Sequence, residues 1–259
     1  MRYLIVALLV CYANLLTAQN TAVSSNEKLT FTAAYNMSGI MTDLAEVTME
    51  TKSVKTSKAT LLHLKCKATT YSKWDNFFKI RDLYESYVSP TTLKPYLYKR
   101  DINEGGYYKF MQYTFKHKTN TVESLKRKRR KDGTTWDEKK KISINSGTND
   151  IVTTIYSIRN LNLDNASSGK TFNLKVIFDN AEYNITLIYK GKETLNTAIG
   201  NKSCHKLAIQ VNNSNVLQGS SNNLLWLTAD ANKIPVYAKF KIPVGNGELK
   251  IKSASGLLN

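Results

Sequence analysis

The chain has 259 residues, a formal net charge of +17, 42% hydrophobic residues, 12 Gly, 4 Pro and 3 Cys. The apolar content excludes a disordered polyelectrolyte, the scarcity of glycine and proline excludes a fibrous protein, and three cysteines are too few for a disulfide scaffold. We therefore expect a folded protein with a large core. Its positive charge either serves solubility or attracts anionic partners such as membrane head groups and acidic glycans.

The first 18 residues have the pattern of a secretory signal peptide. A short basic start precedes an apolar run over 3–13, and Ala18 supplies a small residue for cleavage. The run is too short for a permanent transmembrane helix, which needs about 18 or more apolar residues. We expect a signal peptide at 1–18, removed on export, and a single domain over 19–259.

Most of the remaining chain alternates apolar and polar residues with a period of two, which is typical of half-buried strands. Turn signals such as Asp179-Asn180 and Gly200-Asn201 separate the runs. Strands with one polar, solvent-facing side and one apolar side favour an antiparallel sheet. The sequence therefore predicts an all-β fold, a curved antiparallel meander that forms a barrel, a half-barrel or a sandwich-like sheet.

The segment 148–160 departs from this period and predicts the main helix. Three isoleucines recur at i, i+4 and i+7 from Ile151, and Thr148, Asn149 or Asp150 can cap the first turn. About ten residues do not form a stable helix alone in water. We expect this helix to lie on the sheet or to plug one end of it.

A run of six cations, here called the basic segment, also departs from the alternation. It consists of Lys126, Arg127, Lys128, Arg129, Arg130 and Lys131. The turn signal Asp132-Gly133 follows it, so we expect an exposed hairpin or long loop. Export excludes a nucleic-acid partner. Two interpretations stay open: a solvated tip, or an electrostatic contact with an anionic membrane surface or acidic glycan, with Trp136 as an interfacial anchor.

The sequence contains no familiar catalytic or metal-binding motif. His63, His117 and His205 are not spaced as metal ligands, and no nucleophile elbow, phosphate-binding loop or Cys-x-x-Cys pair is present. We therefore expect no metal, no cofactor and no enzymatic activity.

The two cysteines beyond the signal peptide are expected to face opposite sides of the sheet. The alternation places Cys66 on an apolar face and Cys204 on the face opposite Leu207. An oxidising compartment favours a disulfide between them, whereas the facing argues against it.

Short pieces of the sequence, in a fixed order, resemble the exported bacterial domain-of-unknown-function family 3108. They are Arg81 to Pro90, Leu93-Lys94-Pro95, Arg100, Asn149-Asp150, Ile155 to Arg159 with Tyr156, Gly169, Ile199-Gly200, Cys204 to Leu207, Leu225 to Asp230 with Trp226, Ile234-Pro235-Val236 and Val244-Gly245. The resemblance implies a Gram-negative envelope protein, periplasmic or associated with the outer membrane, with no assigned reaction. The basic segment departs from the family pattern.

The residues of these pieces have simple structural interpretations. Asp150 is expected to cap the helix, Asp230 to form a turn before Pro235, and Trp226 to lie in the core. Arg159 is either a last-turn cation or the partner of Asp150 or Asp230 in a partly buried ion pair.

Two functions fit these expectations. The first is a non-enzymatic binding protein whose curved sheet encloses an apolar groove for a lipid or other amphiphile, although the same side chains could instead fill the core. The second is a structural or assembly partner that docks other envelope proteins by a strand edge or by the basic segment.

Overall fold

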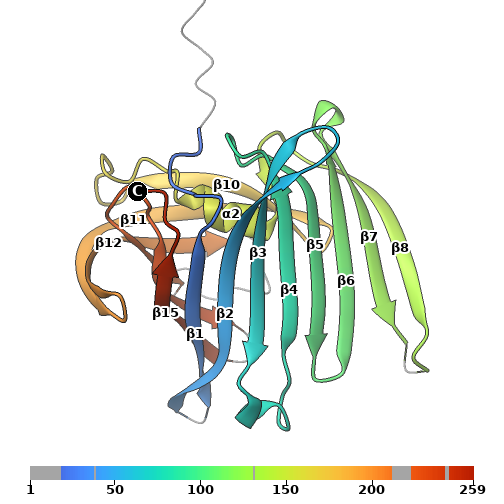
Figure 1. The fold of residues 1–259 in the computed structure, drawn as a ribbon, viewed down its shortest axis with the longest axis horizontal. Helices are drawn as coiled ribbons and strands as arrows, with labels where there is room; N and C mark the ends of the chain where they lie inside the picture. The colour runs from blue at the N-terminus through green and yellow to red at the C-terminus, as the bar shows by residue number, and fades with distance from the viewer. Residues whose placement is uncertain (1–18, 38, 131, 212–222, 243–244) are drawn as a thin grey trace, which may run out of the picture.

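The computed structural model describes residues 19–37, 39–130, 132–211, 223–242 and 245–259, and these form one strongly curved sheet of fifteen strands with a helix against its inner face (Figure 1). The elements are β1 Lys28–Met37, β2 Ile40–Lys55, β3 Thr60–Thr70, η1 Ser72–Trp74, β4 Arg81–Val88, β5 Pro95–Glu104, β6 Tyr107–Lys116, η2 His117–Thr119, β7 Thr121–Arg129, β8 Thr135–Ser143, β9 Thr148–Asn149, α2 Ile151–Ile158, β10 Thr171–Phe178, β11 Ala181–Thr197, β12 Gly200–Val211, β13 Leu224–Thr228, β14 Pro235–Ile242 and β15 Gly245–Ser255.

The strands follow one another as two meanders that meet at β1 and β15. The order across the sheet is β8-β7-β6-β5-β4-β3-β2-β1-β15-β14-β13-β12-β11-β10-β9. Nearly every neighbour pair is antiparallel and joined through a hairpin, as the period-two pattern predicts. The exception is the short β9, which pairs parallel with β10 and makes the sheet mixed. The two edges, β8 and β9, are not paired with each other, so the all-β half-barrel is open.

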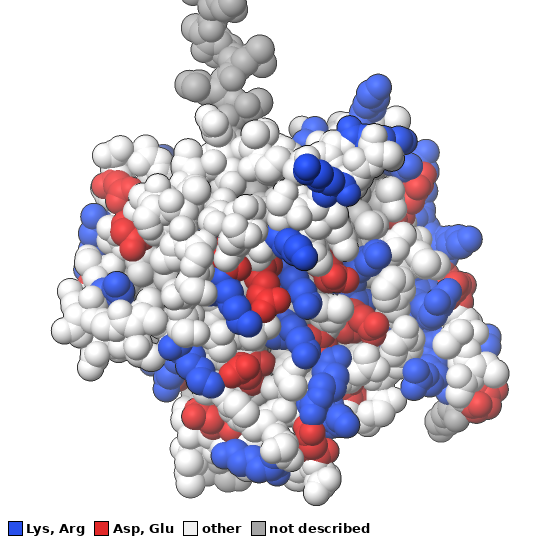
Figure 2. All heavy atoms as spheres, in the orientation of Figure 1, with Lys and Arg blue, Asp and Glu red and all other residues white. Residues whose placement is uncertain are grey.

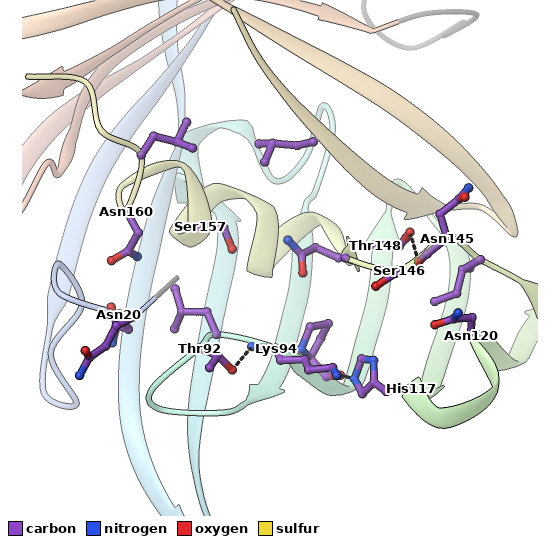
Figure 3. A pocket seen from close by; sticks show the side chains of 18 residues that line it. Asn20, Thr92, Lys94, His117, Asn120, Asn145, Ser146, Thr148, Ser157 and Asn160 are labelled. Carbon is purple, nitrogen blue, oxygen red and sulfur yellow. Dashed lines mark hydrogen bonds between the residues drawn. The ribbon is translucent and has the colours of Figure 1, made fainter. Parts of the chain in front are cut away.

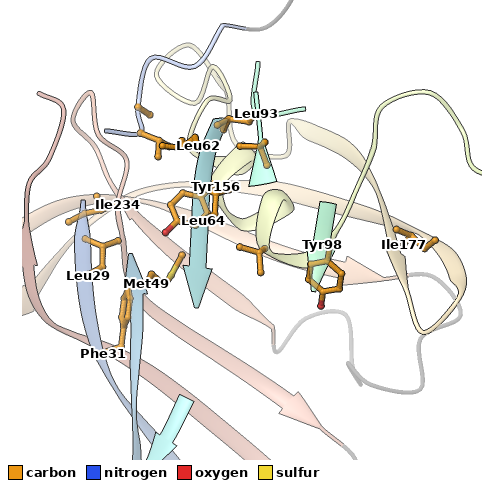
Figure 4. Packing of buried hydrophobic residues seen from close by; sticks show 14 of the residues in the cluster. Leu29, Phe31, Met49, Leu62, Leu64, Leu93, Tyr98, Tyr156, Ile177 and Ile234 are labelled. Atoms are coloured by element: carbon orange, nitrogen blue, oxygen red, sulfur yellow. The ribbon is translucent and has the colours of Figure 1, made fainter. Parts of the chain in front are cut away.

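The main hydrophobic core lies on the inner face and draws on both meanders. Leu29, Phe31 and Leu64 are buried there beside Tyr156 of α2 (Figure 4). Trp226 of β13 belongs to the same cluster. A second cluster lies on the other face of β11, β12 and β13, which explains why those strands are apolar on both sides. Among the described residues, these side chains pack together on the inner face, which favours the filled core over the open apolar groove, the two alternatives that the sequence left open.

Helix α2 is shorter than the predicted 148–160, because Thr148 and Asn149 pair with β10 as a strand. Asp150 is its N-cap, and its side chain accepts a hydrogen bond from the backbone N–H of Thr153. The helix is enclosed on most sides: Val152 and Tyr156 are buried in addition to Ile158 of the predicted isoleucine stripe, whose other two members are half-buried. Tertiary packing therefore stabilises eight residues that could not hold a helix alone.

The turn between β10 and β11 reaches the inner face of the other meander. Asp179 accepts hydrogen bonds from Arg100 of β5 and Lys109 of β6. The backbone N–H of Asn180 donates to the hydroxyl of Tyr113 at 2.9 Å, and the Asn180 amide oxygen accepts from Ser124 at 2.6 Å. These contacts tie β10 and β11 to β5, β6 and β7 and hold the sheet in its curved form.

Candidate functional site

A cavity of about 480 Å³ lies at one end of the sheet (Figure 3). Its walls come from the start of the described chain, the β4–β5 and β6–β7 connections, the link between β8 and β9, and the end of α2. The volume falls within the range of small-molecule sites, about 300 to 1,000 Å³. This cavity is the strongest candidate site in the described part of the chain.

The cavity has an apolar part. Leu93, Pro95 and Ile144 line it and are themselves buried, whereas Leu161 and Leu174 are half-buried. Leu93 lies in the tight β4–β5 loop, has a positive φ of 55°, and donates its backbone N–H to the Ser89 carbonyl. The loop thus presents a leucine to the cavity where a turn would ordinarily carry a polar residue.

The rest of the lining is rich in amides and hydroxyls. Asn160 is the most informative, because its side-chain oxygen accepts the Thr21 N–H at 2.8 Å while its side-chain nitrogen is buried with no hydrogen-bond partner among the described residues. The hydrogen bond that the Asn160 side-chain oxygen accepts fixes the orientation of the side-chain amide. A buried N–H without a partner costs free energy that a ligand acceptor would recover.

The charges around the cavity favour a neutral or anionic ligand. Lys94 lines it and is exposed. The His117 ring nitrogen Nε2 faces the Pro95 carbonyl at 2.5 Å, and burial lowers the pKa of this histidine. Glu182 lies nearby, but its carboxylate is already bound by Asn145 and Thr148.

Asp150 and Ser86 join the helix to the sheet. The Ser86 hydroxyl donates to the Asp150 carboxylate at 2.6 Å, and Thr153 donates to it through both its backbone N–H and its hydroxyl. Burial raises the pKa of Asp150, and the hydrogen bonds from Ser86 and Thr153 oppose that rise. Its role is the helix cap expected from the sequence.

Arg159 forms a buried ion pair, but with a partner that the sequence did not indicate. Both Arg159 and Glu27 are completely buried, and the guanidinium donates to the two carboxylate oxygens at 2.6 and 2.7 Å. It also donates to the carbonyls of Ala22 and Asn232. The expectation of Asp150 or Asp230 as partner is wrong, because Asp150 caps the helix at its other end.

The remaining motif residues have structural positions. Asp230 accepts the backbone N–H groups of Asn232 and Lys233 at 3.0 Å each, which closes the turn before Pro235 at the start of β14. Trp226 is buried in the core, stacks on Tyr237 with 4.9 Å between ring centroids, and donates its ring N–H to Glu193.

The basic segment is part of a hairpin, one of the two forms that the sequence predicts, but it is less exposed than expected. Residues 126–129 are part of strand β7, and Lys126, Arg127 and Lys128 are half-buried. Lys126 pairs with Glu138 of β8 and Arg127 with Asp137, because these residues are cross-strand neighbours. Only Arg129 and Arg130 are exposed among its described members, and Lys131 lies outside the described residues.

The aromatic residues beside the basic segment are within cation–π distance. Lys128 lies 6.0 Å from the Trp136 ring centroid, and the Arg129 guanidinium lies 4.8 Å from that of Tyr108. Trp136 is half-buried on β8. The strand accommodates four cations because acidic and aromatic side chains of its neighbours face them.

Both described cysteines are free. Burial raises the pKa of the Cys66 thiol to about 12 and that of Cys204 to about 11, so neither is a reactive thiolate. His205 contacts the hydroxyl of Tyr189 at 3.1 Å and Asp164 at 3.2 Å, and burial lowers the pKa of this histidine.

Two further searches cover the described residues alone. No group of three or more His, Cys, Asp or Glu side chains there is arranged to hold a metal ion. No helix in that part of the chain has both the length and the apolar character needed to cross a bilayer.

The sequence alone did not identify the cavity. Its lining comes from three connections, the start of the described chain, the end of α2 and strand β10. Residues such as Asn160 and Ser157 have no pattern that distinguishes them from ordinary loop and helix-end residues. The nearest signal was the Leu93-Lys94-Pro95 piece, which lines the cavity.

The open curved sheet, its enclosed helix and its end cavity define a β half-barrel protein. The chain belongs to the family described as "Protein of unknown function (DUF3108)", whose model matches residues 30–252. This confirms the family that the ordered motif pieces indicated. No curated protein matches the sequence.

One solved structure supports the fold, and two others match more weakly. The chain is similar to a β-barrel-like protein of the DUF1849 family from Brucella abortus, with a TM-score of 0.54, 6% identity, and 90% of this chain and 98% of that chain covered. It also matches a candidate lipoprotein from Parabacteroides distasonis (TM-score 0.34, 9% identity, 90% and 96% covered). A third match is a candidate exported protein with a YmcC-like fold from Bacteroides fragilis (TM-score 0.31, 8% identity, 90% and 97% covered).

Proposed function

We propose that the protein is exported to the cell envelope and is a non-enzymatic binding protein that holds a small amphiphile in the end cavity. The observation that carries this proposal is the combination, in one cavity of about 480 Å³, of a leucine and isoleucine wall with the buried, unpartnered N–H of Asn160. Ligand sites usually combine apolar walls with fixed polar groups, and this cavity has both, although polar side chains outnumber apolar ones in its lining.

The orientation of the ligand follows from the lining. Its apolar part lies against Leu93, Ile144 and Leu174, and an acceptor oxygen of its polar part takes the Asn160 N–H. Lys94 at the rim favours an anionic or neutral polar group over a cationic one. The amphiphile therefore occupies the end of the sheet rather than its filled interior.

Export rests on the signal-peptide pattern of residues 1–18, which lie outside the described structure. The family resemblance supports a periplasmic or outer-membrane-associated location. The second candidate function, docking of other envelope proteins through a strand edge, has less support. The edge strand β8 carries consecutive lysines at 139, 140 and 141, and such charges disfavour edge-to-edge pairing.

Native mass spectrometry of the protein purified from its own cell envelope tests the proposal. We expect a bound species of discrete mass that organic extraction releases. Ser157→Phe, on the face of α2 that lines the cavity, should abolish the bound mass by filling the space. Ser167→Phe is the matched control, because Ser167 is exposed and does not line the cavity.

A second variant separates the polar contact from the volume. Asn160→Asp keeps an oxygen that accepts the Thr21 N–H but replaces the buried donor by an acceptor. It should weaken binding of a ligand that presents an oxygen. Equal bound mass in the parent, Ser157→Phe and Asn160→Asp proteins would show that the ligand lies elsewhere.

A further inference from the structure

The end of the sheet opposite the cavity carries four successive structures: the β1–β2 turn, the β3–β4 loop, the β5–β6 turn and the β7–β8 turn (Figure 1). They are here called the hairpin tips. Three of them expose large apolar or aromatic side chains. Ile40 is 70% exposed, Phe77 is 75% exposed and Tyr107 is 50% exposed. Single exposed apolar residues are normal on a protein surface, but several of them along one edge indicate an interaction site.

The hairpin tips form one continuous edge. The Trp74 ring N–H donates to the Asp43 carbonyl at 2.8 Å, which joins the β3–β4 loop to the base of the β1–β2 turn. The Phe78 ring lies directly over Gly105, whose N–H donates to the Lys79 carbonyl at 2.9 Å. Arg129 of β7 lies over Tyr108, next to the β5–β6 turn. Side-chain and backbone contacts therefore run from one tip to the next.

Cations accompany the apolar residues on this edge. The described tip residues with positive charge are Lys73, Lys79, Arg81, Lys128, Arg129 and Arg130, and those with negative charge are Asp43, Asp75, Glu104 and Asp132. Asp75 is paired with Arg81, and Asp132 accepts hydrogen bonds from Thr134 in its own turn. Lys73, Lys79, Arg129 and Arg130 are exposed cations of the tips, and Lys79 and Arg129 line the same surface depression as Tyr107.

The middle of the sheet face formed by β1 to β5 has a different charge pattern. Across β1 to β5, the register places Lys28, Glu50, Lys65, Glu85 and Lys99 side by side in alternation. Acidic and basic side chains are accordingly interspersed over the middle of the sheet face (Figure 2). The tips thus differ from the middle of this face in combining exposed apolar groups with exposed cations.

We propose that the hairpin tips dock the protein on an anionic lipid bilayer. Ile40, Phe77 and Tyr107 enter the interface between head groups and acyl chains, and Lys79, Arg129 and Arg130 face lipid phosphates. Shallow insertion of apolar side chains combined with attraction of cations to anionic lipid is how peripheral proteins bind membranes. The bilayer matches both features of the edge, whereas a free polyanion such as a glycan would leave the apolar side chains in water.

Vesicle co-sedimentation of the mature chain tests this proposal. The vesicles contain phosphatidylcholine with about 30% phosphatidylglycerol, and matched vesicles contain phosphatidylcholine alone. The parent should bind the anionic vesicles and bind the neutral ones much more weakly. Arg129→Ser with Arg130→Ser should weaken binding at low salt by about 30-fold, from about 1 kcal/mol for each cation at 1.4 kcal/mol per tenfold.

The apolar contribution is tested by Ile40→Ser with Phe77→Ser, which should weaken binding at high salt as well as at low salt because it is not electrostatic. The matched control is Leu258→Ser with Lys118→Ser, which removes one exposed apolar residue and one exposed cation at the opposite end of the sheet. The control should bind as the parent does.

A fluorescence measurement locates the contact directly. The emission of Phe77→Trp should shift to shorter wavelength on addition of anionic vesicles, because the ring leaves water. Equal binding by the parent and both tip variants, an equal loss in the control, or equal binding to neutral vesicles would overturn the proposal.

Discussion

The Glu27–Arg159 pair is the most completely desolvated ionic contact of the described residues, with both side chains fully buried. Glu27 precedes β1 and Arg159 ends α2, so the pair joins the beginning of the sheet to the helix. The guanidinium is further satisfied by two carbonyls, and the Tyr156 ring centroid lies 5.7 Å from its central carbon. Complete pairing is what makes such burial tolerable.

Removal of one partner should therefore be costly. We expect Glu27→Ala to lower the free energy of unfolding by about 3 to 5 kcal/mol, because an uncompensated guanidinium stays buried. Chemical denaturation measures the loss. The double variant Glu27→Met with Arg159→Met should recover part of it, since no charge remains unpaired. A loss below about 1 kcal/mol for Glu27→Ala would mean that water reaches the arginine.

Asp82 should make stability depend on pH. Burial raises its pKa from 3.8 to about 7, the neighbouring Glu104 adds to the rise, and the Asn103 N–H at 3.0 Å opposes it. The folded state thus holds a proton that the unfolded state releases near pH 4. The free energy of unfolding contributed by this group consequently falls as pH rises from about 4 to about 7.

Asp82→Asn should remove that dependence while keeping an oxygen for the Asn103 N–H. We expect the difference in unfolding free energy between pH 5 and pH 8 to change by about 2 kcal/mol in favour of the variant at pH 8. Urea denaturation at the two pH values measures it. An unchanged pH profile would show that the Asp82 carboxylate ionises in the folded protein as it does in the unfolded one.

At the residue scale, the sequence predicts local roles well and long-range partners poorly. The Asp150 cap and the Asp230 turn involve bonds within four residues, so local pattern was sufficient. The partner of Arg159 lies 132 residues away in sequence, and nothing in the pattern around Glu27 distinguishes a buried carboxylate from a surface one. Only the fold brings Glu27 and Arg159 together.

At the scale of the elements, the β10–β11 turn makes contacts with three strands of the other meander, β5, β6 and β7. Asp179 and Asn180 have φ values of 47° and 67°, the conformation of a tight hairpin turn that aspartate and asparagine tolerate. Burial of Asp179 opposes its ionisation, but Lys109 and Arg100 nevertheless hold the pKa of its carboxyl below the ordinary value. The turn therefore joins the two meanders through ion pairs of Asp179 with Arg100 and Lys109.

Loss of these ion pairs should measurably lower the free energy of unfolding. Asp179→Asn retains a residue suited to the turn but removes the charge that faces the buried Arg100, and we expect the unfolding free energy to fall by about 2 to 3 kcal/mol. Asp179→Ala should lose about 1 kcal/mol more, because alanine is strained at positive φ. Stability of Asp179→Asn equal to the parent would mean that Lys109 and Arg100 find other partners.

The basic segment shows where element-scale prediction succeeded only in part. Six consecutive cations indicated an exposed hairpin or long loop. The hairpin is present, but four of the cations belong to strand β7 and three of these are half-buried. The error arose because the desolvation of a strand residue depends on its cross-strand neighbours. Glu138 and Asp137 occur only twelve and ten residues later, at the positions that face Lys126 and Arg127 across the hairpin. The hairpin register, centred on Asp132-Gly133, would have predicted these pairs.

At the scale of the whole molecule, the two proposals assign different roles to the two ends of the sheet. The cavity lies at the end that contains the β4–β5 loop, and the hairpin tips lie at the other (Figure 1). Strands of about ten residues separate them, which corresponds to roughly 33 Å at about 3.3 Å per residue. A protein docked by its tips would therefore hold its ligand site well away from the bilayer surface, open to the surrounding compartment.

The curved sheet itself followed from the period-two pattern and the turn signals, but its open form and its filled interior did not. Closure depends on whether β8 and β9 pair, and periodicity within a strand does not determine that. The filling depends on α2, whose enclosure by both meanders makes Val152 and Tyr156 core residues. Only the assembled fold shows that one helix occupies the space where a groove was expected.

The main core joins the two meanders, and this predicts that they unfold together. Leu29, Leu64 and Tyr98 of one meander share a cluster with Trp226 and Val236 of the other. Strands β1 and β15 are also paired along most of their length. Neither meander can bury its inner face alone, so we expect one cooperative transition in chemical denaturation.

Tryptophan variants make that prediction sharp. Trp74→Phe with Trp136→Phe leaves Trp226 to report on β13, whereas Trp226→Phe leaves two reporters in the other meander. In each variant, the fluorescence midpoint should coincide with the midpoint from far-ultraviolet circular dichroism. Addition of Glu27→Ala to either background should move both midpoints equally, because the buried ion pair stabilises the whole sheet. Separate midpoints, or a shift confined to one reporter, would mean that the two meanders fold as independent units.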